Sequence, residues 1–288
     1  MRWSRWSLVG ALAALAATAA AATAAAGGGG PSPGVAVGGD GVRAASDDVR
    51  YVAVGGRGAT VVTAIRVRGG KVVRHTVLPG NLGIPLVAFD GTRGGLAADG
   101  RTLVLATYAG AAPSTSATEL AVIRTRNLRE SRRVRLPGLW AFDAISPDGA
   151  TIFAVEYLSP ETPDRYQVRA IDARSGRLLP GVIVDKRNAG EEMRGLPLTR
   201  ATDREGRWAY TLYAKSDGMG FIHALDTVNR AAVCIDLPWR AQDAFWSMRM
   251  SMAEDGRTLT LRQRGLGRLA VVDLRRFTVR ALRAPVAR

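Results

Sequence analysis

The chain has 288 residues, of which 47% are hydrophobic, and a formal net charge of +15, so it has enough apolar side chains for a sizeable core. Cys234 is its only cysteine, which excludes an internal disulfide. The basic charge favours anionic partners such as acidic cell-wall polymers, anionic lipid headgroups or extracellular DNA, and charge alone does not separate these three.

The first 26 residues have the parts of a secretory signal. Arg2 and Arg5 form a basic start, an apolar run begins at Leu8, and small residues at 24–26 precede a cleavage point. We therefore predict a signal peptide over residues 1–26 and a secreted or cell-envelope-associated protein. The alternative is an uncleaved anchor, because the apolar run is nearly long enough to cross a bilayer. In that case the membrane contact would come only from this N-terminal segment.

The segment that follows is rich in glycine and proline. This composition is typical of a flexible linker, which we predict over residues 27–41. The remaining residues, 42–288, are predicted to form one domain, since all-β domains often reach this size.

A short turn recurs along this domain. Its glycines, Gly100, Gly149, Gly206 and Gly256, are 49, 57 and 50 residues apart, and each follows an acidic residue. An acidic residue before glycine between alternating apolar segments predicts a β-hairpin, because glycine adopts the positive φ of a tight turn at little cost. The apolar segments after the turns are residues 102–106, 151–155, 208–212 and 258–261.

Each turn belongs to a longer unit of four predicted strands. A segment before the turn supplies the innermost strand, and two further strands follow the hairpin. The start of the domain repeats this pattern more loosely, with residues 41–45 as its innermost strand. Four antiparallel strands in about 50 residues are typical of a propeller blade. We therefore predict an all-β fold, a small β-propeller with five blades of four antiparallel strands, closed by this N-terminal strand; an open solenoid or a two-layer sandwich are the alternatives.

One repeat carries a family resemblance. The turn at residues 146–149, the apolar strand after it, a segment that ends in Asp172 and a second turn at residues 175–177 resemble a blade of the surface-layer and lactonase-like (YVTN-type) propellers. WD-repeat and TolB-like propellers share this turn. The resemblance implies an exported bacterial propeller, but the acidic metal or catalytic residues of the lactonase-type members have no match here.

Motifs for catalysis or metal binding are nearly absent. His75 and His223 lie far apart inside apolar segments, and no zinc, nucleophile-elbow or phosphate-loop pattern accompanies them. The repeated aspartates Asp172, Asp226 and Asp273 are predicted to cap turns, and Cys234 is expected to be a buried, unreactive thiol. We therefore predict no catalytic residues, no metal, no cofactor and no specific nucleic-acid binding.

The topology nevertheless predicts one candidate ligand site. In a propeller, the loops from the outer strand of one blade to the inner strand of the next gather at one face, and binding residues are often on such loops. These loops contain acidic, basic and aromatic residues that would suit a polar ligand, or would simply pack and pair with one another. The candidates are Asp90, Arg93, Trp140, Asp143, Glu191, Glu192, Arg194, Arg240, Asp243 and Trp246.

These features favour a non-catalytic module that binds a ligand, another exported protein or an anionic cell-envelope polymer. The alternative is a hydrolase or lyase that acts at the mouth of the channel through Asp90, Asp143 or Asp243, which would require at least two of these carboxylates to lie close together. The oligomeric state is left open.

Overall fold

The computed structural model describes residues 32–45, 47–107, 117–159, 164–188 and 192–286. Within them the regular elements are β-strands, apart from two short 3₁₀ helices, η1 (Lys186–Asn188) and η2 (Gln242–Ser247). None of the helices in this part of the chain is long and apolar enough to cross a membrane. The predicted all-β class is confirmed.

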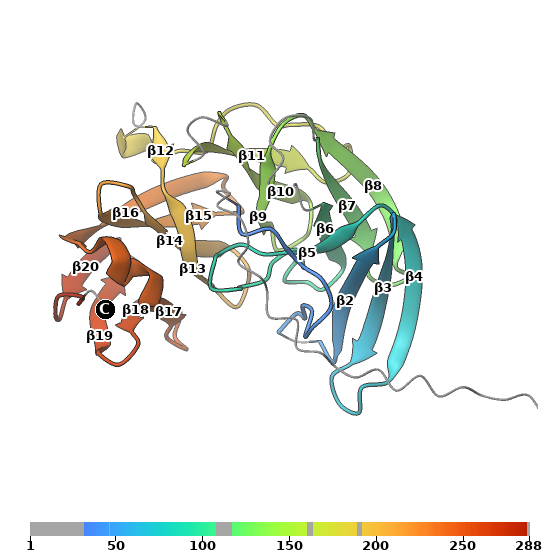
Figure 1. Ribbon diagram of the computed structural model, residues 1–288, viewed down its shortest axis with the longest axis horizontal. Coiled ribbons are helices and arrows are strands. Elements are labelled where there is room, and N and C mark those ends of the chain that lie inside the picture. The colour runs from blue at the N-terminus through green and yellow to red at the C-terminus, as the bar shows by residue number, and fades with distance from the viewer. Residues whose placement is uncertain (1–31, 46, 108–116, 160–163, 189–191, 287–288) are drawn as a thin grey trace, which may run out of the picture.

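The strands form five antiparallel sheets that follow one another in chain order around an arc, with β2–β4 and β17–β20 at its two ends (Figure 1). The first sheet contains β2 (Val49–Gly56), β3 (Ala59–Arg66) and β4 (Val72–Pro79). The second contains β1 (Val35–Ala36), β5 (Leu82–Pro85), β6 (Thr102–Thr107), β7 (Thr118–Arg124) and β8 (Arg129–Leu136).

The other three sheets have four strands each. The third contains β9 (Trp140–Ile145), β10 (Thr151–Tyr157), β11 (Arg165–Asp172) and β12 (Met193–Arg194). The fourth contains β13 (Leu196–Thr202), β14 (Trp208–Ala214), β15 (Met219–Asp226) and β16 (Ala231–Arg240). The fifth contains β17 (Met248–Met252), β18 (Thr258–Gln263), β19 (Gly267–Asp273) and β20 (Thr278–Ala281). Radial repetition of such sheets is the architecture of a β-propeller.

The recurring turns have the geometry that the sequence predicts. Gly100, Gly149, Gly206 and Gly256 all have φ between 64° and 73°, in the left-handed region. The carboxylates that precede three of these glycines accept backbone N–H groups two residues further on, as Asp148 does from Ala150 at 3.0 Å. Asp172, Asp226 and Asp273 likewise accept backbone N–H groups of the turns that follow them. Their predicted role as capping residues is confirmed.

The innermost strand of the first sheet comes from the predicted N-terminal segment. Val42 pairs with Tyr51 of β2, and their backbone N–H groups and carbonyls exchange hydrogen bonds of 2.9 and 2.7 Å. Gly41 makes this approach possible, because a Cβ atom there would lie 2.0 Å from the carbonyl oxygen of Tyr51. Part of the segment that we predicted as a linker also pairs with a sheet, since Val35 and Ala36 of β1 pair with β5.

The innermost strand of the second sheet is split by an excursion, residues 86–93, which we call the crossing segment. On one side β5 pairs with the end of β6, and on the other Leu96 pairs with Leu103. The crossing segment runs from β5 toward β13 (Figure 1), where Phe89 and Asp90 donate backbone hydrogen bonds of 2.9 and 3.0 Å to the carbonyls of Pro197 and Leu198. The Phe89 ring also contacts Trp246, with 5.6 Å between ring centroids. The second sheet is thereby tied to the fourth and fifth.

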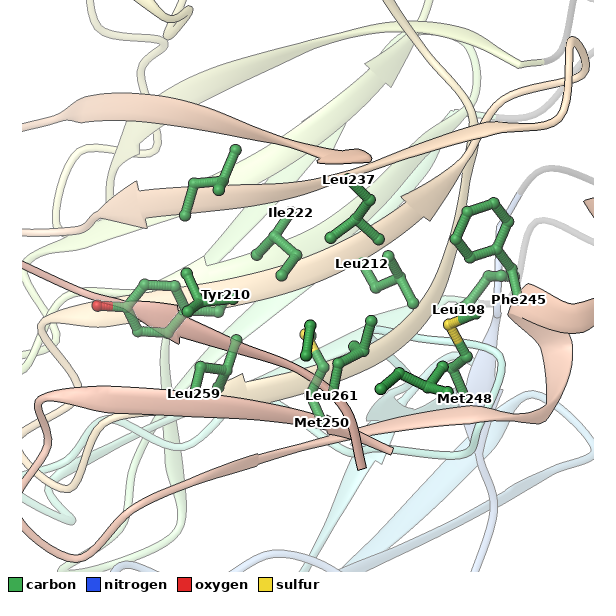
Figure 2. Close-up of a cluster of buried hydrophobic side chains, with 14 of the residues drawn as sticks. Leu198, Tyr210, Leu212, Ile222, Leu237, Phe245, Met248, Met250, Leu259 and Leu261 are labelled. Atoms are coloured by element: carbon green, nitrogen blue, oxygen red, sulfur yellow. The ribbon is translucent and has the colours of Figure 1, made fainter. Parts of the chain in front are cut away.

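Apolar side chains fill the spaces between neighbouring sheets. Between the fourth and fifth sheets, Leu212 and Ile222 face Leu261 and Met250, and Phe245 of η2 covers one end of the cluster (Figure 2). Burial of one such leucine contributes roughly 1.5–3 kcal/mol relative to an exposed position. This packing fixes the positions of the inner strands, which carry the candidate site.

The glycine turns differ in the space around them, which gives a direct stability test. Gly149→Ala would place a Cβ atom 2.3 Å from the Thr102 hydroxyl, whereas a Cβ atom at Gly256 would meet nothing within 4 Å. We expect Gly256→Ala to cost about 1–2 kcal/mol of unfolding free energy from the positive φ alone, and Gly149→Ala to cost about 1–3 kcal/mol more. Urea denaturation of both variants measures the difference; equal losses would contradict the packing of Gly149 on Thr102.

Candidate functional site

A cleft of about 340 Å³ lies where the inner strands of the first four sheets converge. Its walls come from residues 43–45, residues 93–98, the second half of β9, and the end of β13 with the turn after it. The volume is in the range of small-ligand sites. The cleft therefore lies at the end of the inner strands that leads into the hairpin turns, and not at the end where the chain enters these strands.

A buried ion pair joins the third and fourth sheets in the wall of the cleft. Arg200 of β13 contacts a carboxylate oxygen of Asp143 of β9 through Nη2, and it donates from Nη1 to the carbonyl of Asp143. Its Nε donates to the Thr211 hydroxyl at 2.8 Å. The side chains of Arg200 and Asp143 are only 4% and 2% exposed. Because a buried charge is costly without a partner, each of these residues requires the other.

Two carboxylate oxygens in the cleft wall have no donor among the described residues. These are Oδ2 of Asp143 and Oδ1 of Asp203, and both atoms are buried. Burial raises the pKa of Asp203, and the nearby charge of Glu205 adds to this effect. Both oxygens are enclosed by protein atoms without a donor in the described part of the chain, which is unusual because buried polar atoms are nearly always hydrogen-bonded.

Three exposed arginines also line the cleft: Arg43, Arg93 and Arg204. None of them takes part in an ion pair with a carboxylate of the described residues. Arg93 and Arg43 also border an adjoining hollow of about 350 Å³. The Arg93 guanidinium lies against Gly39, where a Cβ atom would be 3.2 Å from Nη2. The cleft thus offers several free guanidinium donors beside one buried pair.

Two of the predicted site residues, Arg93 and Asp143, meet in this cleft. Asp90 lies in the crossing segment and accepts hydrogen bonds from the backbone and hydroxyl of Thr92, at 2.9 and 2.6 Å. Trp246 is 50% exposed and contacts Phe89 of the same segment. These residues are therefore near the centre of the fold, but they are already engaged with protein groups.

The other predicted residues lie elsewhere. The Trp140 ring is buried in the core and donates from Nε1 to the carbonyl of Pro137 at 2.8 Å. Glu192 pairs with both Arg165 and Arg194, and Glu192 and Arg194 border a separate small hollow. Arg240 donates to the carbonyl of Asp217 at 3.0 Å, and Asp243 is exposed on η2. Glu191 lies outside the described residues.

The three aspartates of the hydrolase alternative do not gather at the cleft. Asp143 is paired with Arg200, Asp90 caps its own turn, and only Asp143 of the three lines the cleft. A general acid and base need to flank one substrate bond. In the part of the chain that the structure describes, no group of three or more histidine, cysteine or acidic residues is placed to hold a metal ion.

Sequence reasoning did not select Arg43, Arg200, Asp203 and Arg204. Arg200 has a recognisable signal, since it lies in the middle of the apolar inner segment 198–201, and an arginine at a buried position requires a partner. Arg43, Asp203 and Arg204 have no such signal, because turns on solvent-exposed faces contain the same residue types.

A second buried polar group lies beside this site. His223 of β15 is almost fully buried, and its Nδ1 is 3.9 Å from Sγ of Cys234 on β16. Cys234 is half-buried, in contrast to the fully buried thiol that we expected, and its backbone N–H donates to Asp185 at 2.8 Å. Burial opposes ionisation of Asp185, but hydrogen bonds from Arg187 and from this N–H outweigh it and lower the pKa of Asp185 to about 2.

Comparisons with known proteins agree with this fold. No protein-family model matches the chain, and no curated protein sequence matches it. Among solved structures, it is similar to the dihydro-heme d1 dehydrogenase NirN in complex with DHE, with a TM-score of 0.51 and 16% identity over 86% of this chain and 45% of that chain. It is also similar to the β-propeller domain of Myceliophteria thermophila Cps50 (Swd1), with a TM-score of 0.47 and 13% identity over 79% of this chain and 63% of that chain.

A third similar structure is TolB from Acinetobacter baumannii, with a TM-score of 0.40 and 14% identity over 81% of this chain and 57% of that chain. The chain spans less than two thirds of the length of each of these three proteins. At these identities the likeness concerns the fold alone. The protein is a β-propeller, as predicted, and its arc of antiparallel sheets carries this conclusion.

The Asp143–Arg200 pair gives a clear prediction for stability. Asp143→Ala leaves Arg200 buried without a counter-charge, so we expect a loss of about 3–5 kcal/mol in the free energy of unfolding. Adding Arg200→Met should recover part of that loss, because no buried charge is then left. Arg276→Ala, which removes an exposed ion pair with Asp273, is the control and should change little. Denaturant titration of these three variants and of the single variant Arg200→Met measures the coupling; simple additivity would contradict it.

His223 should make stability depend on pH. Burial lowers the pKa of His223 from 6.5 to about 4. Between these values the unfolded chain binds a proton that the folded protein does not, so stability falls as the pH drops through this window, by about 3 kcal/mol for this group. His223→Gln should flatten that part of the curve of unfolding free energy against pH. Parallel curves for the variant and the wild type would contradict the assignment.

Proposed function

We propose that this chain is an exported, non-catalytic β-propeller that binds an anionic cell-envelope polymer at its central cleft. The observation that carries the proposal is the set of three arginines on the cleft, Arg43, Arg93 and Arg204, which have no carboxylate partner among the described residues. Guanidinium groups bind carboxylates and phosphates through paired, charge-assisted hydrogen bonds. A cleft with such free donors therefore suits an acidic ligand.

The charge of the whole chain supports the same class of partner. At +15, the protein attracts polyanions from a distance and raises their concentration near its surface. This attraction alone would not select a place on the surface, because exposed arginines occur on most sheets. The cleft supplies the place, since it combines unpaired arginines with a concave, partly apolar wall.

The signal segment at residues 1–26 supports the proposed location. A polymer of the cell envelope, such as an acidic polysaccharide, would meet the protein only after export. Of the three aspartates of the hydrolase alternative, only Asp143 lines the cleft, and it is paired with Arg200, so binding without turnover is the function we propose.

The proposal predicts a salt-sensitive interaction that depends on particular arginines. We expect the purified protein to sediment with isolated cell wall at low ionic strength, and to be released at about 1 M salt, where the Debye length is about 3 Å. The variant with Arg43, Arg93 and Arg204 all changed to Ala should bind at least roughly tenfold more weakly, since hydrogen bonds to charged groups contribute about 1.5–3 kcal/mol each.

The matched control changes Arg124, Arg126 and Arg135 to Ala. These three arginines are exposed near the edge formed by β7 and β8 and lie outside the cleft, so the control loses the same charge at another place. Equal weakening in both triple variants would mean that binding follows the net charge alone. No retention of the wild type at low ionic strength would overturn the proposed function.

A further inference from the structure

We propose that the anionic polymer crosses from the cleft into the adjoining hollow, so that two consecutive charged units of the polymer bind at the same time. This inference rests on the proposed function and specifies how much of the polymer is bound and along which path. It comes from two residues, Arg43 and Arg93, which line both the cleft and the adjoining hollow. We call them the bridging arginines.

The cleft and the adjoining hollow are similar in size but differ in charge. Their volumes are about 340 and 350 Å³, and each is in the range of a small-ligand site. Asp143 and Asp203 line the cleft together with its arginines, whereas none of the described residues that line the adjoining hollow is acidic. The adjoining hollow is therefore a favourable place for an anion, and a ligand confined to the cleft would leave it unused.

The bridging arginines are attached to backbone that is fixed by strand pairing. Arg43 follows Val42, which exchanges two backbone hydrogen bonds with Tyr51 of β2. Arg93 pairs with Leu86 in an antiparallel bridge at the base of the crossing segment. Ligand binding would therefore order the two side chains but not their backbone, which limits the entropy that binding costs.

The Arg93 guanidinium reaches across to the N-terminal segment. A Cβ atom at Gly39 would be 3.2 Å from its Nη2, and Gly41 and Val42 of the same segment line the adjoining hollow. A guanidinium has several N–H donors in a planar fork, so one arginine can contact two neighbouring anionic groups. The bridging arginines are therefore suited to hold the junction between two charged units.

The residues that line only one of the two hollows define a path for the polymer. Arg204 lines the cleft alone, and Gly91 and Thr92 line the adjoining hollow alone. One unit would then lie between Arg204 and the bridging arginines, and the next unit beside Thr92. Gly91 is exposed, and a Cβ atom there would meet nothing within 4 Å. This side of the hollow is therefore open, so a longer chain can continue into solvent.

Two kinds of repeating unit share the required chemistry: sugar acids, which carry carboxylates, and alcohol phosphates joined by phosphodiester bonds. The test therefore uses two series of probes. One consists of galacturonate with its dimer and tetramer, and the other of glycerol 3-phosphate with its phosphodiester-linked dimer and tetramer. The series with the larger gain from the single unit to the dimer identifies the charged group.

Isothermal titration calorimetry on the full chain should be run in about 0.15 M salt, where the Debye length of about 8 Å limits the attraction by distant charges. In one series the dimer should bind at least roughly tenfold more tightly than the single unit, because its second unit meets the adjoining hollow at a high effective concentration. The tetramer should gain no more than about threefold over the dimer, because it offers only about three positions for two consecutive units.

Thr92 allows the second unit to be tested separately, since it lines the adjoining hollow and not the cleft. Thr92→Glu adds a negative charge there, and Thr92→Gln is the neutral variant of the same size; both lose the hydroxyl group that contacts Asp90. The ratio of the dimer affinity to the single-unit affinity should be at least about threefold lower in Thr92→Glu than in Thr92→Gln, because like charges repel.

Thr278→Glu is the control for net charge. Thr278 is exposed on β20 and lies outside both hollows, so this variant has the same net charge as Thr92→Glu and should keep the wild-type ratio. Thermal unfolding of the three variants confirms that they are folded. Equal ratios in Thr92→Glu and Thr92→Gln would overturn the inference that a second unit occupies the adjoining hollow.

The remaining outcomes separate this inference from the proposed function. Dimers that bind no more tightly than single units would overturn the two-unit inference and leave anion binding at the cleft in place. A tetramer that gains as much over the dimer as the dimer gains over the single unit would overturn it as well, since affinity would then follow the charge of the ligand. Cell wall that is retained while neither series binds would also overturn it. If neither series binds and cell wall is not retained, the proposed function itself fails.

Discussion

Burial of both faces of the second, third and fourth sheets is the constraint on which this structure depends. The central strands β6, β10 and β14 of the second, third and fourth sheets are buried over almost their whole length, so neither face of these three sheets can be left in water. Each of them must therefore pack against a neighbour on both sides, and the first and fifth sheets form the two ends of the resulting arc (Figure 1). This packing leaves a cleft between the innermost strands at the centre of the arc, and polar residues such as Asp143 and Asp203 line it.

The hairpins of this fold could be predicted from the sequence because their causes are local. A turn of the type Asp148-Gly149 specifies a positive φ and a backbone hydrogen bond within a few residues, and its recurrence at about 50-residue intervals indicates the repeat. Even the innermost strand of the first sheet follows from this periodicity, as the pairing of Val42 with Tyr51 shows. Apart from the addition of β1 to the second sheet, the strand order within each sheet then follows from the succession of hairpins.

The features that the sequence did not reveal depend on contacts between distant residues. Nothing local indicates that Val35 and Ala36 pair with β5, or that residues 86–93 leave their own sheet to reach β13. The candidate site was therefore only partly anticipated: Arg93 and Asp143 were selected as residues of loops that lead into the inner strands, whereas the cleft that they line also includes the ends of these strands and the turns after them. Arg200 was not selected because its role depends on the carboxylate of Asp143, which is 57 residues away in the sequence.

The crossing segment also changes how the repeats depend on one another. In a linear array of repeats each unit contacts only its neighbours, so the ends can unravel separately. Here Phe89 joins the second sheet to Pro197 and Trp246, so the fifth sheet cannot detach without exposing an aromatic contact in the first half of the chain. Closing this loop of more than a hundred residues costs conformational entropy early in folding. The hairpins depend on contacts within one repeat and can form as each repeat is synthesised, but the ring contact of Phe89 must wait until Trp246 has been added to the chain.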